Sequence, residues 1–294
     1  MEVHLVDGTY ELFRHHFAVP ARADGDGVEI AATRGVLGSL LGLLEDGATH
    51  VAVATDHVVE SFRNDLWDGY KTSAGMDPEL LGQFPILEDA LRALGVVVWP
   101  MVELEADDGL ASGAAVAGAE ARVERVLICT PDKDLSQCVV GDRVVQVDRR
   151  KQEVRDEVGV VAKFGVHPAS IPDWLALVGD SADGFPGLPG WGAKSASAVL
   201  SRYGHLEAIP TRAQSWDVEV RGAARLATVL AEQRELAELF RDLATLRTDA
   251  EVGAVDDWRW TGPGPDLQAW AERLGSRSLI RRAEQLARER KPSP

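Results

Sequence analysis

The chain has 294 residues, with 45% hydrophobic residues, a formal net charge of −16 at pH 7 and two cysteines. This length predicts two domains, or one with a large extension, and the composition is that of a globular protein with a sizeable core. The sequence lacks an apolar run of eighteen residues, a secretory signal and a disulfide framework, which excludes membrane-spanning and exported classes and makes the cytoplasm the expected compartment.

Short apolar runs alternate with helical patterns in the first half of the chain. Strands are expected at residues 3–7, 50–56, 96–99, 126–130 and 144–147. Helices are expected between them at residues 33–45, 85–94 and 105–119. This alternation predicts an α/β fold with a mainly parallel sheet. From Val160 onward the pattern is helical, with loops at 179–192 and 210–217. We therefore expect an α/β domain over residues 1–155 and a helical region over residues 156–294.

Carboxylates recur where the predicted strands end and where one predicted helix begins. Asp7, Asp56 and Asp132 lie at strand ends, the edge at which open α/β sheets bind ligands. The set that can converge has nine members: Asp7, Asp56, Glu105, Asp107, Asp108, Asp132, Asp134, Asp180 and Asp183. Any single one is more often a cap or turn residue. Their repetition at strand ends is what favours a binding site.

A cluster of carboxylates requires cations, because close carboxylates repel one another and raise one another's pKa. Mg²⁺ or Mn²⁺ suits oxygen ligands and water. Two such ions about 4 Å apart can stabilise both the attacking and the leaving oxygen in phosphodiester displacement. The sequence offers no Ser-His-Asp or Cys-His arrangement, and its seven histidines show no zinc-ligand spacing.

Residues 177–196 combine acidic residues with a glycine-rich turn. Asp180 and Asp183 are three residues apart, so a helical turn can place both carboxylates on one face. The following glycines permit tight turns, and the helix expected from Lys194 has free backbone N–H groups for a phosphate. The alternative is an ordinary helix-turn-helix with solvated aspartates.

Together these motifs resemble the flap endonuclease/5′-nuclease family, and are closest to the 5′→3′ exonuclease domain of bacterial family A DNA polymerases. Nearly the whole chain carries the resemblance. The matching segments are Val3–Gly8, Ser61–Arg63, Gly69–Lys71, Glu105–Asp108, Thr130–Leu135, Gly179–Lys194, Leu246–Asp249 and Leu274–Ile280. Because the chain ends where a polymerase would begin, we expect a stand-alone nuclease.

The resemblance implies a PIN-like fold and structure-dependent 5′ cleavage of DNA, including flaps, ends and RNA primers. It implies that the nine carboxylates hold two Mg²⁺ or Mn²⁺ ions, that Arg14 and Lys71 contact the scissile phosphate, and that Phe13 stacks on a terminal base. It further implies a helix–three-turn–helix motif that grips duplex DNA and binds K⁺ through carbonyl oxygens. The residues of this motif are Gly187, Gly190, Gly192, Lys194 and Ser195. A monomer that works beside replication and repair proteins is expected.

Two departures from the family pattern and two rival functions remain. Gly184 stands where the family often has Asn, which predicts a looser loop, and the basic residue that usually follows the active-site lysine is absent until Arg92. The rivals are a branched-DNA-binding protein that does not cut, and a PIN-like ribonuclease. Phe13 could instead be a core residue, and Lys71 a solvated surface lysine.

The charge is unevenly distributed along the chain. Residues 1–200 have 16 basic and 32 acidic side chains, whereas residues 201–294 have 15 of each. Metal-free DNA is therefore expected to dock loosely through basic residues near the C-terminus, and divalent ions are expected to bridge DNA to the acidic part. Those basic residues are Arg277, Arg281, Arg282, Arg288, Arg290 and Lys291.

Overall fold

A computed structural model describes residues 1–290. The chain folds into two compact units, and both are discontinuous in sequence. Of the described residues, the first unit comprises 1–59, 73–130 and 248–290, and the second comprises 60–72 and 131–247. Among the described residues, no helix combines the length and the apolar character needed to cross a membrane.

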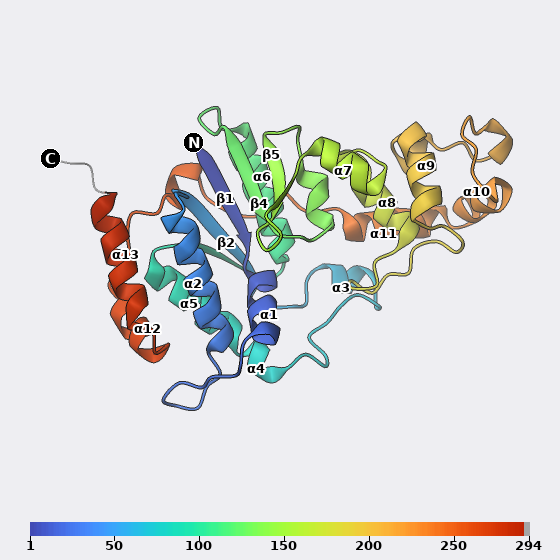
Figure 1. Cartoon of the computed structure of the whole chain (residues 1–294). Helices are drawn as coiled ribbons and strands as arrows, with labels where there is room; N and C mark the ends of the chain where they lie inside the picture. The colour runs from blue at the N-terminus through green and yellow to red at the C-terminus, as the bar shows by residue number, and fades with distance from the viewer. Residues whose placement is uncertain (291–294) are drawn as a thin grey trace. The chain divides into compact units, whose positions relative to one another are not determined.

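Parallel strands form the centre of the first unit (Figure 1). The strands are β1 (Glu2–Asp7), β2 (His50–Asp56), β3 (Val97–Met101) and β4 (Arg125–Cys129), and their order is β3-β2-β1-β4. In the parallel register Leu5 lies opposite both Ala52 and Ile128. These three side chains are fully buried, as a sheet covered on both faces requires.

The first unit also contains helices, three of which pack directly on its strands. The helices of this unit are α1 (Gly8–Ala18), α2 (Ala31–Glu45), α4 (Pro78–Leu81), α5 (Gln83–Leu94), α6 (Ala106–Ala119), α12 (Leu267–Arg273) and α13 (Arg277–Glu289). Helix α6 packs against all four strands, α1 packs against β2, and α5 packs against β2 and β3. The α/β expectation is confirmed.

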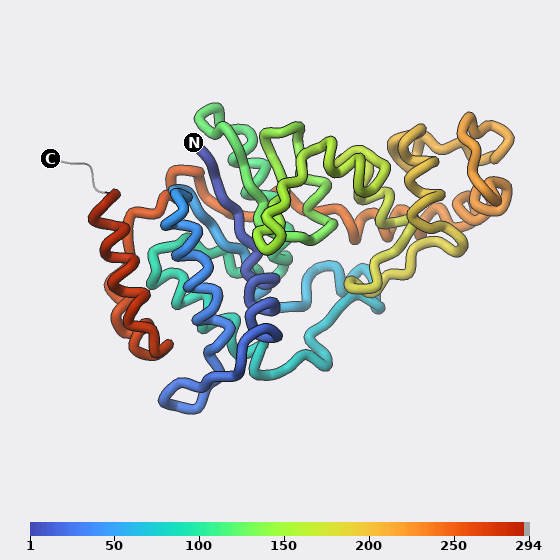
Figure 2. The backbone as a smooth tube through the Cα atoms, viewed as in Figure 1, coloured from blue at the N-terminus to red at the C-terminus, as the bar shows by residue number. Residues whose placement is uncertain are grey.

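The chain returns to the first unit at its C-terminal end, where α13 packs on α2 (Figure 2). Arg282 forms an ion pair with Glu45 at 2.6 Å. Arg290 donates a hydrogen bond to the Ala48 carbonyl at 2.9 Å and lies over the Trp260 ring. Two of the C-terminal basic residues expected to attract DNA therefore hold the helix in place. Lys291 lies outside the described residues.

The second unit is mainly helical. Its elements are α3 (Arg63–Leu66), the antiparallel pair β5 (Val144–Asp148) and β6 (Glu153–Arg155), and helices α7 (Glu157–Phe164), α8 (Ile171–Val178), α9 (Ala193–Tyr203), α10 (Ala223–Glu232) and α11 (Arg234–Ala244). Helix α8 packs against α9 and α11 around a core that includes Leu175, Phe185 and Phe240. The helical region expected after the α/β part is confirmed.

Candidate metal and nucleic-acid site

Two strand-end aspartates of the first unit take part in the turns that follow their strands. Asp7 is 5% exposed and caps α1, since its Oδ1 accepts a hydrogen bond from Tyr10 N at 2.8 Å. Its Oδ2 accepts a hydrogen bond from Thr130 Oγ1 at 2.8 Å. Asp56 Oδ1 accepts from Ala106 N, in the first turn of α6, at 2.7 Å. The parallel strands and α6 thus bring both carboxylates to one edge.

Three further predicted carboxylates surround the start of α6. Glu105 occupies the cap position, and Asp107 and Asp108 lie in the first turn, where the helix dipole favours negative charge. Asp108 is fully buried, and its Oδ2 accepts a hydrogen bond from Glu105 N at 3.0 Å. This carboxylate therefore fixes the beginning of the helix, whichever ligand the edge binds.

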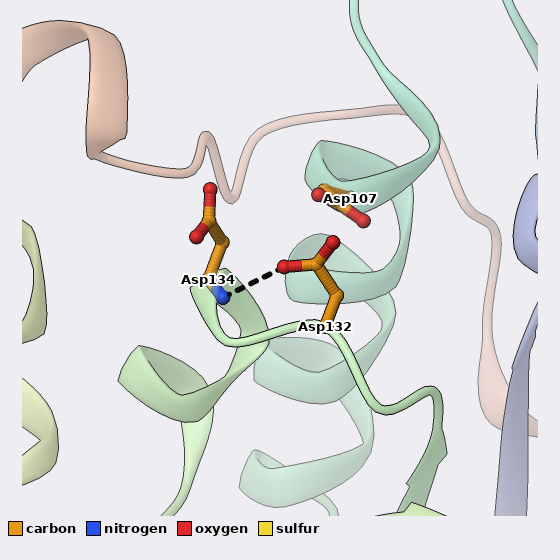
Figure 3. A group of neighbouring side chains, drawn as sticks. All are labelled: Asp107, Asp132 and Asp134. Atoms are coloured by element: carbon orange, nitrogen blue, oxygen red, sulfur yellow. Dashed lines mark hydrogen bonds between the residues drawn. The ribbon is translucent and has the colours of Figure 1, made fainter. Parts of the chain in front are cut away.

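In the second unit, Asp132 and Asp134 form a short turn. Asp134 N donates a hydrogen bond to Asp132 Oδ1 at 3.0 Å (Figure 3). The 3₁₀-helix η1 (Asp134–Cys138) begins at this point, and Asp134 is only 5% exposed. Local hydrogen bonding thus holds the second aspartate in a buried position.

Asp180 and Asp183 lie in a tight turn within the loop expected at residues 179–192. Helix α8 ends at Val178, and the loop closes through two hydrogen bonds between Asp180 and Phe185, at 2.8 and 3.0 Å. Asp180 Oδ1 also accepts a hydrogen bond from Ala182 N at 3.0 Å. Both carboxylates are buried.

We call Asp134, Asp180 and Asp183 the aspartate triad, because one oxygen of each lies within 4.8 Å of the others. Burial and then the charges of Asp132 and Asp183 raise the pKa of Asp134 well above its ordinary value. Asp134 Oδ1 is buried and has no hydrogen-bond partner among the described residues. Three buried carboxylates, one with an oxygen that accepts no hydrogen bond, fit a hard divalent cation.

Two lysines contact the triad, one predicted from the sequence and one missed. Lys71 Nζ lies 2.9 Å from Asp183 Oδ1, and Lys71 N donates to the Asp183 carbonyl at 3.0 Å. Lys133 forms an ion pair with Asp180, and its Nζ lies 3.8 Å from Asp134 Oδ1. Burial opposes protonation, but these two carboxylates outweigh it and raise the pKa of Lys133. In the sequence, the position of Lys133 between Asp132 and Asp134 was the feature that could have identified it as a residue of the site.

Arg63 anchors the segment that carries Lys71, a role that its surroundings in the sequence did not indicate. Its side chain is 1% exposed, with Nε donating to the Leu243 carbonyl at 2.8 Å and Nη2 to the Thr245 carbonyl at 3.2 Å. These carbonyls lie at the C-terminal end of α11, where a cation is favoured. A buried arginine in the Ser61–Arg63 motif therefore fixes residues 60–72 within the second unit.

Gly184 does not loosen its loop, contrary to expectation. Its φ is +84°, and a Cβ at this position would lie 2.0 Å from the Gly69 carbonyl oxygen. Trp67 Nε1 also donates a hydrogen bond to the Gly184 carbonyl at 3.2 Å. Only glycine allows these two segments to approach so closely, so the loop is held tightly.

Phe13 and Arg14 lie on α1 in the first unit. The Phe13 ring packs edge-on against Phe84, with 6.5 Å between ring centroids, and is half-buried. Arg14 Nη2 lies 2.5 Å from Glu11 Oε2, so a buried carboxylate orients the guanidinium. One turn further on, the aromatic side chain of Phe17 is 76% exposed, which the sequence pattern did not predict.

The glycine-rich loop between α8 and α9 ends in an exposed helix start. Gly187 and Gly190 have φ of +69° and +84°, whereas Gly192 has an extended backbone with φ of −155°. Ser195 Oγ accepts a hydrogen bond from Gly192 N and donates one to the Gly192 carbonyl, both at 3.0 Å. Lys194 is exposed in the first turn of α9. An anion can reach this helix start.

The α/β unit, the helical unit and their buried carboxylates define a nuclease class, and comparison of the sequence gives the family. Residues 2–165 match the family described as "5'-3' exonuclease, N-terminal resolvase-like domain", and residues 166–266 match "5'-3' exonuclease, C-terminal SAM fold". The chain belongs to the 5′-3′ exonuclease family.

Relatives include a whole exonuclease and parts of longer polymerases. The chain is 29% identical over 291 residues to a 5′-3′ exonuclease of Aquifex aeolicus, covering 98% of this chain and 96% of that protein. It is 36% identical over 290 residues to DNA polymerase I of Rhizobium leguminosarum, covering 95% of this chain. The chain spans only 28% of that polymerase's length.

Solved structures share the fold at low identity. T5 5′-exonuclease with bound zinc has a TM-score of 0.65 at 15% identity, covering 98% of this chain and 99% of that one. The catalytic core of Rad2 in complex with DNA substrate has a TM-score of 0.63 at 15% identity, covering 96% and 91%. The similarity extends over both units.

Proposed function

We propose that the chain is a structure-dependent 5′→3′ exonuclease and flap endonuclease that hydrolyses DNA phosphodiesters with two divalent ions. The observation that carries the proposal is the aspartate triad, with its buried Asp134 oxygen that accepts no hydrogen bond. Membership of the 5′-3′ exonuclease family supplies the reaction class. We propose DNA with 5′ flaps, 5′ ends or RNA primers as substrate, in the cytoplasm and by a monomer.

We propose that all nine carboxylates serve one pair of Mg²⁺ or Mn²⁺ ions. Such ions polarise a phosphodiester oxygen and activate water when they are bound. Support comes from each unit separately: the first collects five carboxylates at the strand ends and at the start of α6, and the second collects the triad beside Asp132. Without cations, charges as close as those of the triad would repel one another.

Basic residues would then act on the phosphate. We propose that Lys71 and Arg14 place positive charge against the scissile phosphate, where charge develops during displacement. Lys71 is supported by its ion pair with Asp183, and Arg14 by the buried Glu11 that orients it. Phe13 is proposed to stack on the terminal base.

We propose that residues 156–294 provide most of the duplex binding and residues 1–155 most of the chemistry. The exposed start of α9 supports this division, since Lys194 and the first backbone N–H groups are available to a phosphate. Gly187, Gly190, Gly192 and Ser195 would shape the turns, and their carbonyl oxygens would hold K⁺.

Cleavage assays on defined substrates test this function. A 5′-labelled flap duplex should be cut in Mg²⁺ or Mn²⁺ and left intact in EDTA. The same duplex without the 5′ single strand and a single-stranded RNA of equal length serve as comparisons. Binding of the flap without cleavage in either metal would favour the branched-DNA-binding protein, and faster cleavage of the RNA would favour the ribonuclease.

A further inference from the structure

Lys133 lies between the two aspartates of its turn and contacts two members of the aspartate triad. Its Nζ forms an ion pair with Asp180 Oδ2 and lies 3.8 Å from Asp134 Oδ1. Lys71 Nζ contacts the remaining member, Asp183, at 2.9 Å. Three carboxylates therefore face two ammonium groups within the same unit, which offsets part of their negative charge without a metal ion.

The ion pair uses the oxygen that a metal would need. Asp180 Oδ1 already accepts the hydrogen bond from Ala182 N, and its Oδ2 is held by Lys133. A divalent cation bound through Oδ2 would meet this ammonium at close range, and the repulsion between the two positive charges favours release of the lysine. The Lys133 side chain is 33% exposed, so its four-carbon stem can carry the ammonium to water once it is released.

We propose that Lys133 is a built-in counter-ion, which holds the aspartate triad together in the metal-free protein and is exchanged for a divalent ion when the site fills. The inference rests on the proposed function, because it takes the triad as part of the metal site. It makes Lys133 a residue that sets metal affinity. Lys71 differs because its segment is fixed by Arg63 and by the Lys71 N hydrogen bond to Asp183.

Replacing Lys133 with a neutral side chain of similar length tests the exchange. Isothermal titration calorimetry with Mg²⁺, without DNA, should show Lys133→Met binding about tenfold more tightly than the wild type, because no ammonium competes. In EDTA the variant should melt at a lower temperature than the wild type, because the carboxylates lose their counter-ion. Its Mg²⁺-induced rise in melting temperature should be larger.

Lys151→Met is the matched control. Lys151 also pairs with a buried aspartate of the second unit, Asp148, at 3.4 Å, but lies outside the triad. This variant should bind Mg²⁺ as the wild type does. Unchanged or weaker Mg²⁺ binding by Lys133→Met would overturn the exchange but not the proposed nuclease function. A wild type that binds no divalent ion would overturn the proposed function as well.

Amine labelling of the wild-type protein gives an answer even if Lys133→Met does not fold. Mass spectrometry after brief acetylation should show Lys133 modified several-fold faster in Mg²⁺ than in EDTA, with Lys151 modified at the same rate in both. A Lys133 rate that does not rise while calorimetry records Mg²⁺ binding would contradict the exchange.

Discussion

At the scale of single residues, Asp134 combines burial with negative neighbours, and both raise its pKa. When a carboxyl group has a higher pKa in the folded than in the unfolded state, the protein loses stability as the pH rises through the folded-state pKa. At pH 7.5 the metal-free protein is therefore less stable than it would be with a neutral side chain in place of the Asp134 carboxylate. We expect Asp134→Asn in EDTA to raise the melting temperature at pH 7.5 by about 2–4 °C, the shift that roughly 1 kcal/mol produces in a domain of this size.

The pH dependence of the stability difference shows whether Asp134→Asn acts by removing the carboxylate charge. The advantage of Asp134→Asn should shrink as pH falls through the raised pKa, because the wild-type carboxyl then becomes neutral too. Differential scanning calorimetry in EDTA at several pH values measures it. A variant less stable than the wild type at pH 7.5 would show that the charged carboxylate stabilises the metal-free protein.

The positions of several site residues could be predicted from the sequence, but the contacts that hold them could not. Asp7 and Asp56 could be predicted because a strand end is a local signal that periodicity reveals. The burial of Arg63 could not, since its acceptor carbonyls at Leu243 and Thr245 are about 180 residues away along the chain. Lys133 was overlooked because its importance depends on Asp180, which only folding brings close.

At the scale of elements, the loop before α9 offers a matched pair of glycines. A Cβ at Gly187 would lie 2.4 Å from Gly179 N, and its φ is +69°. Gly192 has an extended backbone, and a Cβ there would meet nothing within 4 Å. We expect Gly187→Ala to cost roughly 2–4 kcal/mol of unfolding free energy and Gly192→Ala to stay within about 0.5 kcal/mol.

Urea denaturation measures both glycine variants. Their DNA affinities add a functional test, because the proposed close approach of a phosphate to α9 leaves little room for a methyl group at Gly192. Equal stability losses in the two variants would show that the loop is not shaped as described. Wild-type DNA affinity in Gly192→Ala would remove this residue from the duplex contact.

Helix α9 also provides a charge-matched comparison for DNA binding. Lys194 is exposed in its first turn, whereas Arg202 near its end is paired with Asp217. We expect Lys194→Ala to weaken duplex affinity and to reduce the slope of log affinity against log salt by about one phosphate contact. Arg202→Ala should leave the slope unchanged.

Lys71→Ala should lower the single-turnover rate more than the affinity. A loss of affinity in Lys71→Ala and a loss of rate in Lys194→Ala would refute this division of roles.

Elements with strong local periodicity were predicted closely, and elements set by distant contacts were not. The strand expected at 50–56 is β2, and the helix expected at 105–119 is α6 within one residue. The three-residue strand β6 was missed, because its pairing with β5 and not its own pattern defines it. Hydrophobic periodicity also could not show that residues 60–72 belong with residues 131–247.

At the scale of the whole molecule, the excess of acidic residues before residue 200 opposes the approach of DNA. Divalent ions should cancel part of that charge. We expect Ca²⁺, which takes oxygen ligands readily, to tighten binding of a 5′-flap substrate relative to EDTA at matched ionic strength, without cleavage. Fluorescence anisotropy measures it, and Asp180→Asn with Asp183→Asn should shrink the gain. Equal affinities in Ca²⁺ and EDTA would separate the acidic residues from DNA binding.

The buried carboxylates are proposed to hold the ions that cleave DNA. The most direct measurement is single-turnover cleavage of a 5′-labelled flap duplex in Mg²⁺ by Asp132→Asn with Asp134→Asn. The control is Asp142→Asn with Asp242→Asn, which removes two exposed carboxylates from the same unit. We predict that the first variant folds and loses cleavage by at least about a thousandfold, because metal-ion stabilisation of the transition state is worth several kcal/mol, while the control retains the wild-type rate. A folded Asp132→Asn, Asp134→Asn variant that cleaves at a near wild-type rate would contradict the account.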